Sequence, residues 1–166
     1  MNLLNRHDSI RGWFAYELYQ HMKKNKDIWL ICLDLGYKVF DNIRDDFPER
    51  FINPGAAEQA GMGIAVGLAL EGKIPVVYSI TTFLLYRPFE TIRLYLHHEQ
   101  IPVHLVGSGR DKDYHIDGIS HDASDIYGLF ENYNLNPAWP ETKEEIPELM
   151  DWFLYTKAPT FLSLRR

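Results

Sequence analysis

The sequence predicts an open α/β fold, with helices on both faces of a doubly wound, mostly parallel β-sheet. Two observations in the 166-residue chain carry this prediction. Short apolar runs without polar alternation, such as residues 28–33, are typical of strands that are buried on both faces. Longer segments with apolar residues at helical spacing separate these runs, and such an alternation favours parallel strands joined by helical crossovers.

The first half of the chain alternates between three expected helices and three expected strands. Asp8 or Ser9 can cap the first helix, and apolar residues follow at helical spacing. Pro48 closes the connection after the second helix, and Gly72 ends the third. In order, we expect a helix at 8–25, a strand at 28–33, a helix at 39–46, a strand at 50–53, a helix at 57–71 and a strand at 75–80.

The second half continues the same alternation around one long polar segment. The residues from Gly107 to His121 are mostly polar and contain three glycines, which predicts a loop. The chain shows neither an internal repeat nor a linker, so we expect a single domain over 1–166. In order, the elements expected here are a helix at 87–98, a strand at 103–106, a helix at 123–130, a weak strand at 133–136, a helix at 142–156 and a strand at 160–164.

Composition narrows the class of protein. Hydrophobic residues make up 46% of the chain and aromatic residues 14%, as expected of a folded core. The net charge of -6 argues against nucleic acid or an anionic membrane as the main partner. The single cysteine, Cys32, lies in an apolar run and is expected to be a buried strand residue. Because no signal-peptide pattern and no apolar run of about 20 residues occurs, we expect a cytoplasmic domain.

Ligands of open parallel sheets bind beyond the carboxyl ends of the strands. Three segments are expected at that edge, namely 34–38, 54–58 and 79–87, and the loop 107–121 is expected to join them. Glu58 stands in the first turn of the helix at 57–71, where a carboxylate suits the helix dipole. The sequence therefore predicts a polar site around Glu58 at this edge.

The helix at 57–71 carries Gly61, Gly63 and Gly67 in its interior. Each glycine costs about 1 kcal/mol of helix stability relative to alanine, so three together need a structural reason. Close approach of another backbone is the simplest one. Gly63 and Gly67 lie four residues apart on one face, so we expect this face to pack against another helix, in this chain or in another subunit.

Several other interpretations of these segments stay open from residue types alone. Glu58 can be an ordinary acid in the first turn of a helix. The glycines imitate a dinucleotide-binding fingerprint, but the first lies inside the helix and no acid ends the strand at 75–80. His115, Asp117 and His121 suggest a metal site, although their spacing in a loop is nonspecific and no cysteine supports it.

Four motifs, in order along residues 28–166, resemble the central domain of transketolases and of deoxyxylulose-phosphate synthase. The longest is Phe47–Pro75, with Pro-Glu-Arg-Phe followed by Gly-Ala-Ala-Glu-Gln, the glycine-rich helix and Gly-Lys-Ile-Pro. The others are Asp34-Leu35, then Phe83-Leu84 with Arg87, Glu90, Ile92 and Arg93, and finally Asp117-Gly118-Ile119-Ser120-His121. The resemblance implies the pyrimidine-type domain of the thiamine-diphosphate-binding fold.

The resemblance implies thiamine diphosphate as the cofactor and Glu58 as the acid that hydrogen-bonds its pyrimidine nitrogen N1′. This contact promotes loss of the thiazolium C2 proton, and such cofactors carry the hard chemistry while the protein positions them. Phe83, with Tyr86 as second candidate, matches the aromatic residue that stacks on the pyrimidine. Arg87 and Asp34 also match positions on the cofactor side of the site.

Substrate contacts follow from the same resemblance. Asp117 and His121 match residues that contact the hydroxyls and carbonyl of the bound sugar, and His121 is expected to take part in catalysis. Lys38, beside Tyr37, stands near a serine of the family that contacts sugar phosphate. Arg110, or Lys112, is the expected replacement for a histidine with the same task.

The family also requires a diphosphate-binding domain with a Gly-Asp-Gly motif that holds Mg²⁺, and this motif does not occur in the sequence. The resemblance to a family with three domains implies that the diphosphate domain and the third domain are missing here. We therefore expect a partner subunit that brings Mg²⁺ and the diphosphate site, as an α2β2 assembly. The expected function is two-carbon ketol transfer between sugars or sugar phosphates.

Two further functions remain open. The first is the small subunit of a thiamine-dependent 2-oxo acid decarboxylase or dehydrogenase. The Asp-Gly-Ile-Ser-His loop at 117–121 favours ketol transfer, because the family uses this loop for polyol substrates. The second is a non-enzymatic interaction subunit that has kept the fold, against which the presence of Glu58, Asp117 and His121 argues.

Overall fold

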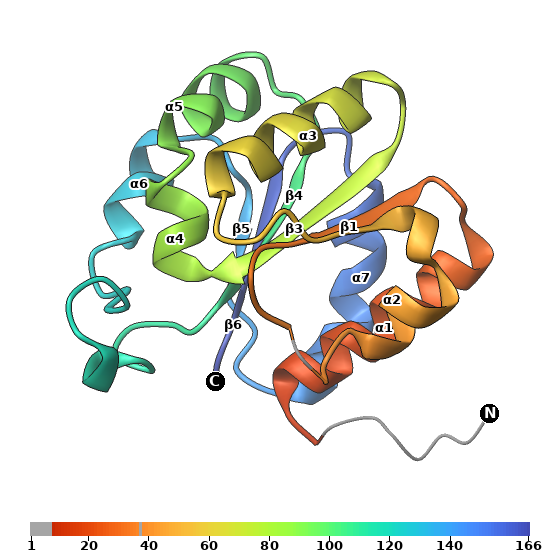
Figure 1. Ribbon diagram of the computed structural model, residues 1–166. Coiled ribbons are helices and arrows are strands. Elements are labelled where there is room, and N and C mark those ends of the chain that lie inside the picture. Colours follow the sequence, from red (N-terminus) through yellow and green to blue (C-terminus); the bar gives the residue numbers. More distant parts are fainter. Residues whose placement is uncertain (1–7, 37) are drawn as a thin grey trace.

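The computed structural model describes residues 8–36 and 38–166, and these form a three-layer α/β domain (Figure 1). Six strands make one parallel sheet in the order β2-β1-β3-β4-β6-β5. The predicted open, doubly wound sheet is therefore confirmed. The strands are β1 (Ile28–Cys32), β2 (Phe51–Ile52), β3 (Ile74–Ile80), β4 (His104–Ser108), β5 (Pro137–Ala138) and β6 (Thr160–Leu164).

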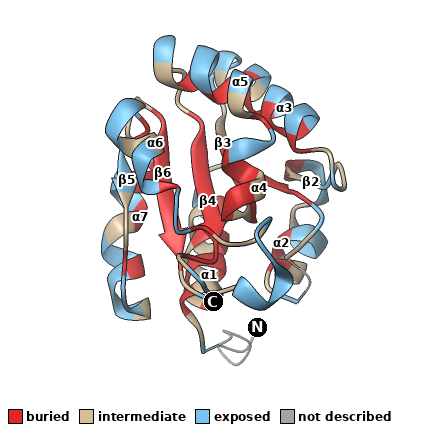
Figure 2. Cartoon of the chain, turned by 90° about the vertical axis from the view of Figure 1, so that its left-hand side faces the viewer, coloured by how far each residue is buried: buried red, intermediate tan, exposed pale blue. Residues whose placement is uncertain are grey.

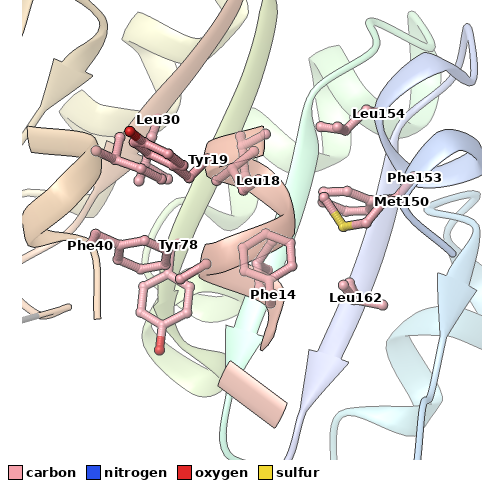
Figure 3. Packing of buried hydrophobic residues seen from close by; sticks show 14 of the residues in the cluster. Phe14, Leu18, Tyr19, Leu30, Phe40, Tyr78, Met150, Phe153, Leu154 and Leu162 are labelled. Atoms are coloured by element: carbon pink, nitrogen blue, oxygen red, sulfur yellow. The ribbon is translucent and has the colours of Figure 1, made fainter. Parts of the chain in front are cut away.

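One face of the sheet is covered by α1 (Ile10–Lys24), α2 (Asp41–Asp46) and α7 (Ile146–Tyr155) (Figure 1). Ser9 caps α1, since its hydroxyl accepts a hydrogen bond from the Gly12 amide at 3.1 Å. Phe14 of α1 packs edge-on against Phe153 of α7 (Figure 3). These side chains have no exposed surface and join the two helices to the central strands.

The opposite face is covered by α3 (Glu58–Leu70), α4 (Thr81–Tyr86), α5 (Phe89–Thr91) and α6 (Tyr127–Asn132). A π-helical segment at Ile92–His98 extends α5, and short 3-10 turns lie at Pro48–Arg50, His115–Asp117 and Lys143–Glu145. The central strands are buried from both sides, while the outer faces of the helices are exposed (Figure 2). This burial explains why the strands lack polar alternation.

The structure corrects three predicted boundaries. Helical structure in this region begins earlier than predicted, because the short helix α4 at Thr81–Tyr86 precedes the predicted segment 87–98, which itself forms α5 and the π-helical segment. The hydroxyls of Thr81 and Thr82, in the first turn of α4, donate to carbonyls of the loop after β4. The helix predicted at 123–130 starts at Tyr127, since Ala123 instead pairs with Asp111.

The weak strand predicted at 133–136 lies at Pro137–Ala138 instead. Leu135 turns into the core, and Asn136 has a positive φ of 43°, so an extended segment starts only after it. Tyr37 lies outside the described residues, so the prediction for the segment 34–38 is followed only at its other positions.

The strand order places a potential ligand-binding site at the carboxyl ends of β2, β1 and β3. Strand β1 lies between β2 and β3, and α3 carries the chain over β1 from one neighbour to the other. Segments that follow these three strands meet at their carboxyl ends, as in other open α/β sheets. No helix within residues 8–36 and 38–166 has both the length and the apolar character to cross a membrane.

Candidate active site

Glu58 is the first residue of α3 and is 4% exposed, although it is a carboxylate at a helix start. Tight packing of α3 brings it there. A Cβ atom added to Gly61, one turn on, would lie 2.5 Å from the Leu33 side chain at the end of β1. The glycine therefore lets α3 approach the strand and sets Glu58 at the carboxyl edge of the sheet.

Arg87, at the end of α4, is the charged partner of Glu58. Its Nη1 donates to Oε1 of Glu58 at 2.6 Å, and its side chain is 45% exposed. The same guanidinium lies 3.6 Å from the ring centre of Phe83. The buried carboxylate and the aromatic ring thus hold one flat, N–H-bearing group between them.

His121 approaches this group from the loop that follows β4. Its ring is 4.7 Å from the Phe83 ring in an edge-on arrangement, and Nδ1 lies 3.0 Å from the Ser120 hydroxyl. Asp117, four residues earlier, is exposed in the 3-10 turn. The structure therefore brings Glu58, Arg87, Phe83 and His121 together, with Asp117 on the same loop as His121.

Two threonines that the sequence interpretation missed hold this loop. Thr81 donates to the Gly109 carbonyl at 2.5 Å, and Thr82 donates to the Ser120 carbonyl at 2.6 Å. Both are buried. Their signal in the sequence was a pair of hydroxyl residues at the carboxyl end of a buried strand, directly before Phe83.

Asp34 and Lys38 lie beyond β1, and both have exposed side chains and positive φ angles of 48° and 67°. The Lys38 amide donates to Asp41 at 3.2 Å. Asp34 lines a cavity of about 220 Å³ between the ends of β1 and β2. Its other lining residues are Leu35, Gly36, Phe40, Asp41, Arg44, Phe51 and Asn53.

Tyr86, predicted as a second stacking residue, bonds outside the Glu58–Phe83 group. Its hydroxyl donates to Asp125 at 2.8 Å, near the start of α6. Burial, together with this hydrogen bond and the charge of Asp125, raises the pKa of Tyr86. Of the two aromatic candidates, Phe83 is therefore the one that contacts the Arg87–Glu58 pair.

Arg110, predicted as a phosphate contact, is 2% exposed. It donates through Nη1 to Glu141 at 2.6 Å and through Nη2 to the carbonyls of Pro140 and Ser163 at 2.8 Å. Its Nε donates to the Ser163 hydroxyl. This arrangement suits a structural role beside β6, since the donors of the guanidinium are used within the chain.

Cys32 is fully buried, and its thiol donates to the Leu35 carbonyl at 2.7 Å. Burial raises its pKa to about 12, which keeps the thiol protonated and unreactive. In the described part of the chain, no group of three or more His, Cys, Asp or Glu side chains is arranged to hold a metal ion.

Comparison with known proteins shows the family of the chain. The family description "Transketolase, pyrimidine binding domain" matches residues 9–166. The chain therefore belongs to the transketolase pyrimidine-binding domain family, whose enzymes depend on thiamine diphosphate. A curated relative is one of the subunits of apulose-4-phosphate transketolase from Actinobacillus succinogenes, which is 28% identical over 72% of this chain and 39% of its own length.

A second relative, the putative transketolase C-terminal section of Methanocaldococcus jannaschii, is 33% identical over 68% of this chain. A third, 1-deoxy-D-xylulose-5-phosphate synthase of a Mycobacterium species, is 37% identical over 57% of this chain. The chain spans 36% and 15% of the lengths of these two relatives. It is thus similar to one part of each protein.

Solved structures agree with the fold. A split-gene transketolase described as an inactive β4 tetramer has a TM-score of 0.82 and 26% identity, over 95% of this chain and 52% of that one. Transketolase from Campylobacter jejuni has a TM-score of 0.84 over 99% of this chain and 27% of its own, but 17% identity, so it supports the fold alone.

Proposed function

We propose that this chain is the pyrimidine-binding subunit of a thiamine-diphosphate-dependent transketolase that transfers a two-carbon ketol unit between sugars. One observation carries the proposal: the buried carboxylate of Glu58 and the Phe83 ring together hold a flat, N–H-bearing group. An aminopyrimidine ring has these same properties. The residues therefore fit the pyrimidine half of the cofactor.

When bound, thiamine diphosphate supplies a nucleophilic carbon for the carbonyl of a ketose. Glu58 contributes a buried carboxyl group that shares a proton with the pyrimidine nitrogen. Phe83 provides the stacking face, and the half-exposed guanidinium of Arg87, which now bonds to Glu58, has to move aside when the pyrimidine binds. Low exposure of Glu58 strengthens the hydrogen bond, because water does not compete for it.

The sugar contacts proposed for this subunit lie in the loop beyond β4. Asp117 is exposed, so its carboxylate is available to accept hydrogen bonds from sugar hydroxyl groups, and the His121 ring packs edge-on against Phe83. Asp34 and Lys38 follow β1 at the same carboxyl edge of the sheet, and both are exposed. An exposed aspartate on this loop favours polyol substrates over the 2-oxo acids of the alternative function.

The partner proposed for the chain is a diphosphate-binding subunit that holds Mg²⁺. Similarity to a single subunit of one transketolase and to the C-terminal section of another supports a division of the enzyme between two chains. We propose an α2β2 assembly in which the exposed glycine face of α3 meets another chain. The cofactor then lies between the two kinds of subunit.

Replacement of Glu58 tests the function directly. In the complex reconstituted with its diphosphate-binding partner, Glu58→Gln is expected to slow deuterium exchange at C2 of bound thiamine diphosphate by at least about 100-fold. Glutamine still donates and accepts hydrogen bonds, but it has no acidic proton to share. Ketol transfer is expected to fall in parallel, with the fold intact by circular dichroism.

Glu90→Gln is the matched control, because Glu90 is an exposed glutamate of the neighbouring helix α5. This variant is expected to exchange the C2 proton at the wild-type rate. A wild-type exchange rate in Glu58→Gln would remove Glu58 from the activation of the cofactor, and with it the main support for this function.

A further inference from the structure

We propose that Tyr114 is a positioning residue that fixes the loop carrying Asp117 and His121. This inference rests on the proposed function for the role of the two residues, but the anchoring itself is measurable without the reaction. The loop runs from Gly109 to Asp122 and includes the exposed isoleucines Ile116 and Ile119, which are 74% and 89% exposed. A loop with so much exposed surface keeps one conformation only if some of its side chains are anchored to the core.

The hydroxyl group of Tyr114 forms hydrogen bonds with the end of β4 and with the distant helix α1. It lies 3.0 Å from the Ser108 hydroxyl at the end of β4, and it accepts a hydrogen bond from Nη1 of Arg11 at 3.2 Å. Ser108, the last residue of β4, is fully buried. These two hydrogen bonds connect the loop to α1 and to the end of β4.

Arg11 is only partly satisfied by hydrogen bonds, and its bond to Tyr114 is one that the structure shows. Its Nε atom is buried without a hydrogen-bond partner in the described part of the chain. An unpaired buried donor destabilises the folded state. The hydrogen bond from Nη1 to Tyr114 reaches across 103 positions of the sequence and gives this arginine a tertiary role at the loop.

The ring of Tyr114 packs against the start of the same loop. A Cβ atom added to Gly109 would lie 2.2 Å from the ring, and Gly109 has a positive φ of 86°, so only glycine fits beneath it. The Arg166 guanidinium lies 5.0 Å from the ring centre on the outside. The ring therefore contacts both the Gly109 backbone and the Arg166 guanidinium, and its hydroxyl forms part-buried hydrogen bonds with Ser108 and Arg11.

Tyr114 contacts both proposed sugar-binding residues, Asp117 and His121. Its carbonyl accepts the Asp117 amide at 2.9 Å, which forms the 3-10 turn that carries Asp117. Its ring centre is 6.4 Å from that of His121. Tyr114 itself touches neither Glu58 nor Phe83 in any described contact, so it is expected to act on the sugar side and not on the cofactor.

Two variants separate the ring from the hydroxyl group. Tyr114→Ala removes both, whereas Tyr114→Phe keeps the ring over Gly109 and loses only the bonds to Ser108 and Arg11. In the reconstituted complex, Tyr114→Ala is expected to raise KM for the sugars and to lower kcat/KM by about 10- to 100-fold, as a displaced contact does. Tyr114→Phe is expected to fall between this variant and the wild type.

Amide hydrogen exchange of residues 109–122 gives a readout that does not depend on activity. Exchange is expected to be faster in Tyr114→Ala, while C2 exchange of the cofactor keeps its wild-type rate. The control is Tyr155→Ala, since Tyr155 is a surface tyrosine of α7 with one hydrogen bond, to His21. This control is expected to leave loop exchange and KM unchanged.

Unchanged loop exchange in Tyr114→Ala would overturn the proposal, and so would faster exchange with wild-type KM. Loss of cofactor C2 exchange would also contradict it, because Tyr114 would then support the whole fold. If the wild-type complex transfers no ketol unit, the proposed function fails, and the predicted effect of Tyr114 on sugar kinetics fails with it. Hydrogen exchange keeps that failure distinct from a failure of the anchor.

Discussion

At the scale of single residues, the ion pair of Glu58 and Arg87 lies in the candidate site and is also expected to stabilise the fold. A buried carboxylate that loses its charged partner is costly, but Arg87 is half-exposed, and water moderates the effect. We expect Arg87→Met to lower the free energy of unfolding by about 1–3 kcal/mol, measured by urea denaturation.

A double-mutant cycle assigns this loss to the pair. In the background of Glu58→Gln, the same Arg87→Met change is expected to cost less, because no buried carboxylate is left unpaired. Arg93→Met is the control, since Arg93 is an exposed arginine of the π-helical segment and is expected to change stability by less than about 0.5 kcal/mol. Equal losses in both backgrounds would contradict the pairing.

His104 gives the fold a pH dependence that is independent of the site. Burial, together with the charge of Lys157, lowers its pKa from 6.5 to about 4. Its Nδ1 lies 2.8 Å from the Thr160 hydroxyl, which itself donates to the Phe153 carbonyl, so Nδ1 is the protonated nitrogen of the neutral ring.

A lowered histidine pKa means that the unfolded chain binds the proton more readily than the folded one. Stability is therefore complete above about pH 6.5 and is lost as the pH falls toward about 4. Between about pH 7 and about pH 5, the His104 contribution is expected to lower the free energy of unfolding by on the order of 1–2 kcal/mol.

His104→Asn keeps an N–H donor for Thr160 but does not titrate. Urea denaturation at several pH values is expected to show a flatter decline for this variant than for the wild type. Parallel curves over this pH range would rule out His104 as the source of the pH dependence.

At the scale of elements, α3 has two kinds of glycine. Gly61 faces the end of β1, where a Cβ atom would clash, whereas no atom of the described residues lies within 4 Å of a Cβ added to Gly63 or Gly67. The prediction was that another backbone comes close to these glycines. Within the part of this chain that the structure describes, Gly61 is instead approached by the Leu33 side chain, and Gly63 and Gly67 face open space. Their open face also contains Ile64, which is 38% exposed.

Gly63→Leu is expected to leave the isolated chain folded, since space is available, and to weaken its association with another subunit, because a large side chain blocks close packing. Sedimentation velocity checks both expectations. Gly128→Leu is the matched control, since Gly128 lies in α6 and also has open space around it. A wild-type chain that stays monomeric with every candidate partner would contradict this use of α3.

At the scale of the whole molecule, the site is assembled from segments that are distant in the sequence. Glu58 comes from the start of α3, Phe83 and Arg87 from α4 and its end, and His121 from the loop after β4. The parallel sheet gathers these segments because all of its carboxyl ends lie on one edge. The same edge carries the cavity at Asp34 between β1 and β2.

The alternation of apolar strands and amphipathic helices determined the fold class by itself, because burial on both faces leaves a clear pattern in residue type. The motif around Glu58 also indicated the family. Boundaries were wrong where a local preference competed with tertiary contacts, as at Thr81 and Asn136. There, hydroxyl–carbonyl bonds and a positive φ decided the outcome.

Only the tertiary structure decided which of the candidate side chains meet. In the structure, Arg87 contacts Glu58 and Phe83, Tyr86 hydrogen-bonds to Asp125, and Arg110 is buried beside β6. The structure also revealed Tyr114, whose partners Arg11 and Ser108 have no pattern in the sequence that connects them to it. A hydrogen bond between residues 103 positions apart depends on how the strands and helices pack, and that packing leaves no local trace in residue type or spacing.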